Sequence, residues 1–99
     1  ANVANQIEFS RGYVAIAGAT HTLRTTQQFA VTAVTCTVSL PDATLCRGKW
    51  YFVKNAPSAA TLTLDGFGAQ TIDGAATLAT STVNEVLRII SNGSNWLRY

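Results

Sequence analysis

The feature that most constrains this chain is the alternation of apolar and hydroxyl-bearing residues in short segments. In residues 34–40 (Val-Thr-Cys-Thr-Val-Ser-Leu) every second side chain is apolar, and residues 61–64 (Thr-Leu-Thr-Leu) continue the pattern. Successive side chains of a β-strand point to opposite faces, so a period of two predicts strands with one buried and one hydrated face. Because most segments share this period, we expect an all-β protein.

Residues 50–53 (Trp-Tyr-Phe-Val) give the strongest further strand signal, since all four are aromatic or β-branched. A strand without polar positions is typical of one that is covered on both faces. Weaker strands are expected at residues 13–17 and 29–31. The apolar phase changes after the second of these, which predicts a turn or bulge at residues 32–33.

The C-terminal segment is compatible with two structures. Apolar residues between positions 82 and 91 fall at helical spacing, which would form one short helix. The Asn92-Gly93 dipeptide favours a hairpin instead, because Asn-Gly between apolar runs is a strong signal for a tight turn. We therefore expect a terminal hairpin built from residues 85–91 and 95–99.

Length and charge bound the organisation of the chain. Its 99 residues correspond to one domain with a thin core, predicted as a small antiparallel β-sandwich or barrel-like domain. We expect this domain to span residues 11–99, after an extended N-terminal arm of residues 1–10. Only 12% of the residues are charged, against a usual share of about 25%. A weakly charged surface on a small core predicts that part of it is buried in an oligomer.

Composition also excludes several partners. The seven basic residues are scattered and the net charge is only +2, so no basic stripe is available to neutralise a nucleic-acid backbone. No apolar run approaches the roughly 18 residues of a membrane-spanning helix. We expect no nucleic-acid partner and no membrane partner.

Candidate catalytic and metal-binding groups are sparse. The single histidine, His21, lies between two threonines and is interpreted as an exposed polar residue near a strand. Asp65-Gly66 followed by Asp73-Gly74 is partly similar to a calcium loop, but the alternating oxygen ligands are missing, so turn chemistry is preferred. The expectation is a protein that is not an enzyme and holds no metal or cofactor.

Two cysteines, Cys36 and Cys46, are too few for a disulfide framework and lack the pairing of a zinc site. Cys36 belongs to an alternating apolar row, which predicts a buried, reduced thiol. A disulfide across the turn at Pro41 is the alternative.

Four aromatic residues could stack on sugar rings if they were exposed, although packing in the core or in an interface is preferred for all of them. Alternation predicts that one of two neighbours, Trp50 and Tyr51, faces the core. The other two candidates are Trp96 and Tyr99.

Several ordered segments resemble motifs of the β domains found in phage tail fibres and on virion surfaces. The similarity extends over residues 28–99, with Arg-Gly in place of the commoner Gly-Arg and Asn92 in place of Asp. The matching segments are Leu40-Pro41, Arg47-Gly48-Lys49-Trp50-Tyr51-Phe52-Val53-Lys54-Asn55, Thr61-Leu62-Thr63-Leu64, Gly68-Ala69-Gln70-Thr71-Ile72-Asp73-Gly74 and Ser91-Asn92-Gly93-Ser94-Asn95-Trp96.

The resemblance implies a β-structured module of the phage particle surface, usually a homotrimer. The motif residues are expected to specify the fold and not to form a binding site. Pro41 would end a strand at the sheet edge, Gly48 would allow close backbone approach before the aromatic strand, Gly74 and Gly93 would take positive φ, Ile72 would pack under a turn, and Trp96 would pack the last strand.

Two functions are compatible with such a module. One is a capsid decoration, or cement, protein that binds the major capsid protein; the other is a receptor-binding tip or accessory domain of a tail fibre or tailspike that contacts host surface glycans. The first is favoured because a 99-residue chain that starts at Ala1 and lacks Met fits a complete short product, whereas fibres need long shafts. A fragment of a long fibre is the alternative.

The N-terminal arm supplies the candidate contacts with the capsid. Val3, Ile7 and Phe9 are apolar anchors in a segment with almost no charge. Ile7 and Phe9 would lie on one side of an extended chain that adds a strand to a capsid subunit or fills a groove on it. A disordered terminus is the alternative.

Overall fold

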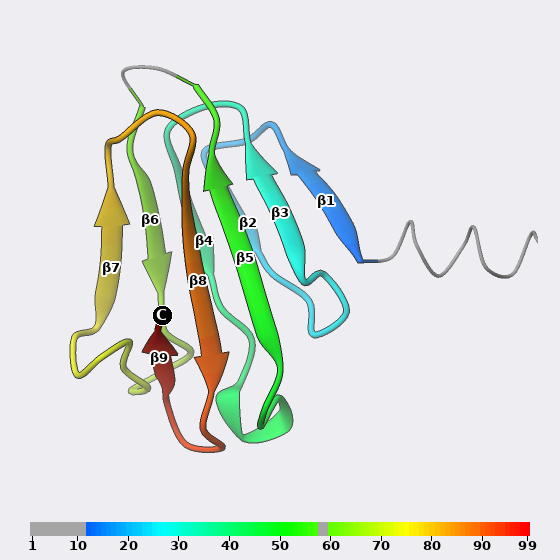
Figure 1. Ribbon diagram of the computed structural model, residues 1–99, viewed down its shortest axis with the longest axis vertical. Helices are drawn as coiled ribbons and strands as arrows, with labels where there is room; N and C mark the ends of the chain where they lie inside the picture. Colours follow the sequence, from blue (N-terminus) through cyan, green and yellow to red (C-terminus); the bar gives the residue numbers. More distant parts are fainter. Residues whose placement is uncertain (1–11, 58–59) are drawn as a thin grey trace, which may run out of the picture.

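The computed structural model describes residues 12–57 and 60–99, whose strands form a two-layered β-sandwich (Figure 1). The five-stranded sheet has the order β1-β3-β5-β8-β9, and the four-stranded sheet has the order β2-β4-β6-β7. The strands are β1 (Tyr13–Ile16), β2 (Thr20–Thr22), β3 (Phe29–Thr32), β4 (Cys36–Ser39), β5 (Trp50–Asn55), β6 (Leu62–Asp65), β7 (Thr77–Thr80), β8 (Glu85–Ser91) and β9 (Trp96–Arg98).

The predicted all-β class is confirmed for the described residues. Their helical content is one 3-10 turn, η1 (Ala43–Leu45), between β4 and β5. The side chain of Asp42 caps this turn by accepting a hydrogen bond from the backbone N–H of Thr44. No helix in this part of the chain is long and apolar enough to cross a membrane.

The chain changes layer after each of its first five strands, so consecutive strands lie in different sheets (Figure 1). Neighbours within a sheet therefore run parallel: β1 pairs with β3, β3 with β5, β2 with β4, and β4 with β6. The three remaining pairings, β5 with β8, β6 with β7 and β8 with β9, are antiparallel.

The predicted sandwich agrees with the structure, but the predicted antiparallel pairing is wrong among the first six strands, and the barrel-like alternative is wrong for the described residues. Both sheets are mixed, and neither closes into a barrel within the described residues. Side-chain alternation depends on which face of a strand is buried and is the same for parallel and antiparallel neighbours. The sequence pattern therefore could not predict the direction of the strands.

The change of apolar phase predicted near residues 32–33 marks one of these crossings. β3 ends at Thr32, and residues 33–35 lead to β4 in the other sheet. The core-facing residues keep an even-numbered phase across this crossing, since Ala30 and Thr32 are buried in β3 and Cys36 and Val38 are buried in β4. The apolar phase changes because the outward positions of β3, Phe29 and Val31, are also apolar. The predicted turn is confirmed, and it takes the chain from one sheet to the other.

The inner faces of the two sheets share one apolar core. Both cysteines are free and buried in it, as predicted for Cys36, and the disulfide alternative is not formed. Burial raises the pKa of the Cys36 thiol above its ordinary value. The core residues are Ile16, Leu23, Ala30, Cys36, Val38, Leu40, Ala43, Cys46, Tyr51, Val53, Leu62, Leu64, Ile72, Leu87, Ile89 and Trp96.

The predicted terminal hairpin is confirmed. β8 pairs antiparallel with β9, with Ser91 opposite Trp96, and the Asn92-Gly93 turn connects them. Gly93 has a φ of 95°, a left-handed conformation that suits glycine in a tight turn.

Trp96 is fully buried, and its indole meets the Tyr51 ring edge-on with centroids 5.3 Å apart. We predict that Trp96→Ala lowers the free energy of unfolding by about 3–5 kcal/mol, because it removes a large buried ring and leaves a cavity. Urea denaturation at fixed protein concentration measures this change, and Trp96→Phe should recover part of it. An alanine variant with an unchanged midpoint that loses sugar binding instead would contradict this prediction.

Candidate functional site

Three of the sequence motifs, residues 40–41, 68–74 and 91–96, meet at one end of the sandwich, where η1, the β6–β7 loop and the β8–β9 turn come together (Figure 1). The backbone N–H of Gly48 donates to the carbonyl of Ser91 at 2.9 Å, and that of Trp96 donates to the carbonyl of Thr71 at 2.8 Å. Ile72 forms backbone bridges with Ala75 and with Trp96. Segments far apart in the sequence are thus joined through their backbones.

Side chains complete this hydrogen-bonded end. Ser91 Oγ donates to the carbonyl of Ala43 at 2.6 Å, and Gln70 Oε1 accepts from the Ala43 N–H at 2.9 Å. Gln70 Nε2 donates to Asp42 Oδ1 at 2.7 Å. This hydrogen bond, together with those from the backbone and hydroxyl of Thr44, lowers the pKa of the Asp42 carboxyl. The polar groups at this end are used to hold loops in place.

The motif glycines have conformational roles. Gly74 and Gly93 adopt the expected positive φ, at 85° and 95°. Gly48 also has a positive φ, 80°, but no atom lies within 4 Å of the position of a Cβ. The prediction of close backbone approach at Gly48 is therefore wrong, because the requirement is a left-handed backbone and not missing volume.

The remaining motif residues support packing. Ile72 is buried beneath its turn, as expected, and Trp96 is buried in the core. Pro41 follows β4, but the expected location at a sheet edge is wrong, since β4 lies between β2 and β6. Proline is tolerated there because it stands beyond Ser39, the last residue of the strand.

The groups considered for catalysis and metal binding do not converge. His21 Nε2 lies 3.1 Å from Gln27 Oε1, which is its hydrogen-bond partner. Asp73 Oδ1 accepts from the backbone N–H of Arg98 at 3.0 Å, and this is ordinary loop chemistry. Within residues 12–57 and 60–99, no group of three or more His, Cys, Asp or Glu side chains could hold a metal ion.

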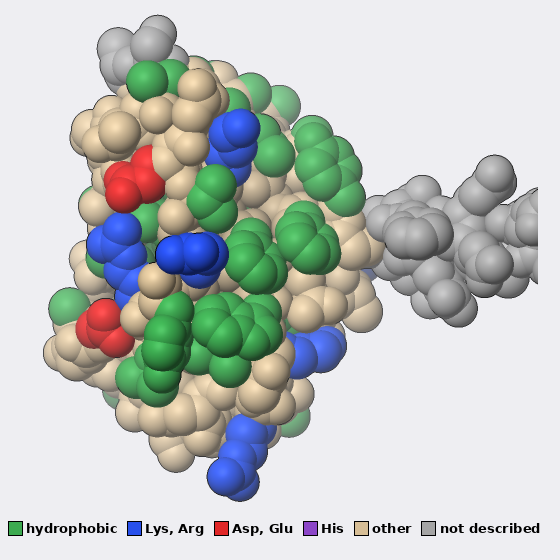
Figure 2. Space-filling model, viewed as in Figure 1, with side chains coloured by type: hydrophobic (Ala, Val, Ile, Leu, Met, Phe, Trp, Pro, Cys, Tyr) green, Lys and Arg blue, Asp and Glu red, His purple; other side chains and the backbone are tan. Residues whose placement is uncertain are grey.

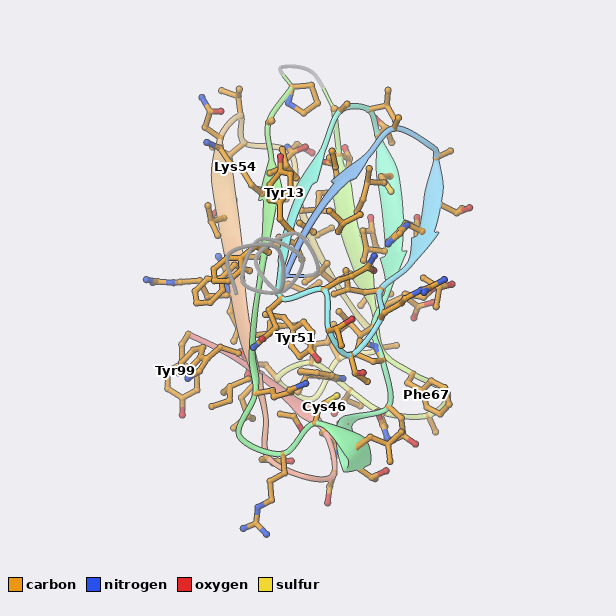
Figure 3. All side chains as sticks on the ribbon, turned by 90° about the vertical axis from the view of Figure 1, so that its right-hand side faces the viewer. Tyr13, Cys46, Tyr51, Lys54, Phe67 and Tyr99 are labelled. Carbon is orange, nitrogen blue, oxygen red and sulfur yellow. The ribbon has the colours of Figure 1, made fainter. Side chains whose placement is uncertain are left out.

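The four aromatic candidates divide between the inside and the outside of the sandwich. Tyr51 and Trp96 lie in the core, and burial raises the pKa of the Tyr51 hydroxyl. Trp50 and Tyr99 are exposed, so the prediction that one of Trp50 and Tyr51 faces the core is confirmed. Figure 3 shows Tyr51 between the layers and Tyr99 projecting outward from the five-stranded sheet.

The outer surface of the five-stranded sheet, called the aromatic face below, is apolar at all but two of its outward positions. Figure 2 shows hydrophobic side chains gathered there with Lys and Arg side chains among them. Burial alternates along each strand, so that the outward set lies on the face opposite to the core. The outward residues are Tyr13, Ala15, Phe29, Val31, Trp50, Phe52, Lys54, Val86, Arg88, Ile90, Leu97 and Tyr99.

Strand register assembles the rings of this face. Tyr13 lies opposite Phe29, and Phe29 lies opposite Phe52, which places three aromatic side chains in one row across β1, β3 and β5. Arg88 on β8 continues the row beyond Phe52. Tyr99 follows β9, and its backbone N–H donates to the carbonyl of Arg88 at 2.9 Å.

The rings contact one another in an ordered way. Phe29 and Phe52 stack with centroids 5.2 Å apart and planes 4° from parallel. Trp50 stacks more loosely on Phe52 at 6.3 Å, and meets Tyr99 edge-on at 5.4 Å and 67°. Such contacts each contribute about 0.5–1.5 kcal/mol beyond area burial, so the rings hold one another in place.

Much of this face is open to solvent. The exposed fractions are 56% for Tyr13, 53% for Phe29, 38% for Trp50 and 67% for Tyr99. Two shallow hollows of about 630 and 410 Å³ lie on it, one beside Phe29 and the other between Trp50 and Tyr99, and both touch Phe52. A strand covered on both faces was predicted for residues 50–53, but the described residues leave its outer face uncovered.

The outer face of the four-stranded sheet has the opposite chemistry. Thr20, Thr37 and Thr63 are in register across β2, β4 and β6, and Thr22 and Ser39 form a second row with Asp65. Short hydroxyl side chains suit a hydrated sheet surface. The two faces of one sandwich therefore differ sharply, and the apolar one carries the candidate site.

Charge on the aromatic face is limited to two cations among the described outward residues, Lys54 and Arg88. The guanidinium of Arg88 donates to the carbonyl of Tyr99 at 3.1 Å. The nearby ion pair between Arg98 and Glu85, at 3.3 Å, involves side chains from the other phase of their strands.

This site could not be predicted from the sequence, for a geometric reason. Tyr13, Phe29 and Phe52 belong to three separate segments, and only the parallel pairing of their strands makes them neighbours. The available signal was local: an all-apolar strand at residues 50–53 on a chain with few charges. No protein-family description and no curated protein matches this sequence.

Gly93 provides a test of the motif-built end. A Cβ at this position would lie 3.1 Å from Arg47 Cδ, and the positive φ adds a cost of about 1–2 kcal/mol for a non-glycine residue. We predict that Gly93→Ala destabilises the protein by at least that amount in thermal or urea unfolding. Gly18→Ala is the matched control, because Gly18 has no positive φ and a contact of 3.6 Å, and it should change stability by less than about 1 kcal/mol. Equal effects of the two changes would refute the role given to Gly93.

Proposed function

We propose that this chain is a non-enzymatic structural protein of the bacteriophage particle surface, and that it acts as a trimeric capsid decoration protein that binds the major capsid protein. The observation that carries the proposal is the aromatic face. A domain that covers one sheet with hydroxyl groups and leaves the other apolar presents the kind of surface by which proteins bind a partner. The phage assignment itself rests on the ordered motifs of residues 28–99.

The motif-built end supports a structural role. Residues that are shared with the resembling phage modules, such as Ile72, Gly93 and Trp96, are engaged in backbone and core contacts. Their contacts specify a stable β domain, and the Asp42 carboxylate and the Ser91 hydroxyl at this end are engaged in hydrogen bonds to neighbouring loops. A virion protein needs such a rigid scaffold more than it needs a reactive group.

The capsid contact is proposed to come from the N-terminal arm. Its candidate residues, Val3, Ile7 and Phe9, lie outside the described residues, so this part rests on the sequence. An extended arm adds backbone hydrogen bonds to a partner sheet, and its apolar side chains fill pockets. Three arms on one trimer would raise a modest single-arm affinity by roughly 10² or more through multivalency.

A receptor-binding tip of a tail fibre or tailspike is the second candidate function. It is favoured by one feature, the edge-on arrangement of Trp50 and Tyr99 beside Arg88, since these three residues and Phe52 line a hollow of about 410 Å³. Flat rings stack on sugars, and a guanidinium binds carboxylate or phosphate groups. Host surface glycans would be the ligands in that case.

The trimer is tested by sedimentation equilibrium of the full chain at micromolar concentration. We expect a mass three times the 10.5 kDa of one chain, because closed symmetric assemblies bury weakly polar surface efficiently. A species of one-chain mass under these conditions would contradict the trimer.

Capsid binding is tested with capsids of the phage that encodes the chain, assembled without it. The full chain should cosediment with them, and a variant lacking residues 1–9 should lose binding while keeping its oligomeric mass. Full binding by the truncated variant would remove the arm from the mechanism. If the full chain does not bind capsids but binds host cells or their glycans, the fibre-tip alternative is supported instead.

A further inference from the structure

We infer that the aromatic face is the surface through which copies of this chain pack against one another. The inference rests on the proposed trimer and assigns its seam, that is, the interface at which its three subunits meet. The occupant of the face is thus the same chain, contributed by the other two protomers.

The first argument is the parallel pairing of β1, β3 and β5. Sheets built from parallel strands are normally covered on both faces, and their strands then lack polar positions. Residues 50–53 of β5 have this composition, yet only the inward side chains of the strand, Tyr51, Val53 and Asn55, are covered by the described part of the chain. The sequence of β5 is that of a strand whose second cover comes from another molecule.

The second argument is composition. The cores of protein interfaces are enriched in Tyr, Trp, Phe and Arg and depleted of acidic residues. The aromatic face offers Tyr13, Phe29, Trp50, Phe52 and Tyr99, and no acidic side chain points outward from its strands in the described residues. Because the rings already stack on one another, little side-chain freedom remains to be lost when they dock.

The third argument is size. Five strands about 4.8 Å apart, with outward side chains over about six residues, give a face of roughly 20 by 20 Å. That projected area of about 400 Å² is half of the roughly 800 Å² that each partner buries in a standard interface, and the accessible area of the face is larger because the exposed rings stand out from the sheet. A single sugar ring would cover one or two of these side chains, whereas equivalent faces grouped around a threefold axis would cover the whole row.

Charge fits the same arrangement. Lys54 and Arg88 would repel their counterparts if two faces met squarely, but faces inclined around a threefold axis leave long cationic side chains free to reach the rim. Arg88 also retains its hydrogen bond to the carbonyl of Tyr99. The closed trimer is therefore more compatible with this face than a flat twofold dimer.

The experiment places a lysine on each face of the sandwich in the full chain and measures mass by sedimentation equilibrium. Phe29→Lys alters the aromatic row, whereas Thr37→Lys alters the corresponding inner strand of the other sheet. We expect wild type and Thr37→Lys to be trimers with the same dissociation behaviour. Phe29→Lys should raise the concentration for half-dissociation by at least about 30-fold, the effect of losing one interface hot spot.

Tyr13→Lys is the second variant, since Tyr13 lies on the edge strand β1 and is more than half exposed, so that folding is spared. Circular dichroism confirms the fold of each variant. If Phe29→Lys and Tyr13→Lys both form trimers that dissociate at the same concentration as wild type, the inference is overturned while the proposed trimer stands.

A wild-type chain of one-chain mass overturns the proposed trimer, and with it the assigned seam. If such a monomer is retained on an immobilised host polysaccharide and Phe29→Lys abolishes retention, the aromatic face is a glycan site instead. Capsid binding by a monomeric wild type would keep the decoration function and reject only the self-association.

Discussion

The constraint on which the rest of the structure depends is the crossing of the chain between the two sheets. After each of the first five strands the chain turns into the opposite layer and reverses its direction, so every second strand runs the same way. Each return to a sheet therefore adds a strand parallel to the one before it. This winding closes the core between the layers, and it also aligns side chains that lie far apart in the sequence on the outer faces.

The two outer faces show what this alignment does. In one sheet it stacks threonines of β2, β4 and β6, and in the other it stacks Tyr13, Phe29 and Phe52 of β1, β3 and β5. A single repeated winding has thus produced a hydrated face and an apolar face on the same small domain. The apolar face explains why a chain with 12% charged residues is expected to associate, since its least polar surface is gathered in one place.

The end of the sandwich that holds the motif residues has a different task. Its backbone hydrogen bonds join η1, the β6–β7 loop and the terminal hairpin, and Gln70 and Ser91 add side-chain links to the same group. This network helps to place β9 beside β8. Tyr99, which follows β9, then lies next to Arg88 of β8 on the aromatic face. The motifs that resemble phage modules therefore act on the candidate site indirectly, by fixing the strands that display it.

The sequence by itself determined the all-β class, the terminal hairpin, the buried thiol of Cys36 and the packing of Trp96, but it left open which of Trp50 and Tyr51 faces the core. These features follow from local rules: side-chain period, the Asn92-Gly93 turn signal and apolar burial. Strand direction, the open face of β5 and the row Tyr13–Phe29–Phe52 were decided only by the tertiary structure. Alternation of apolar and polar residues indicates which side of a strand is buried. Which strands pair, and in which direction, depends on the sheet that each loop leads to, and this is decided by the packing of the whole chain.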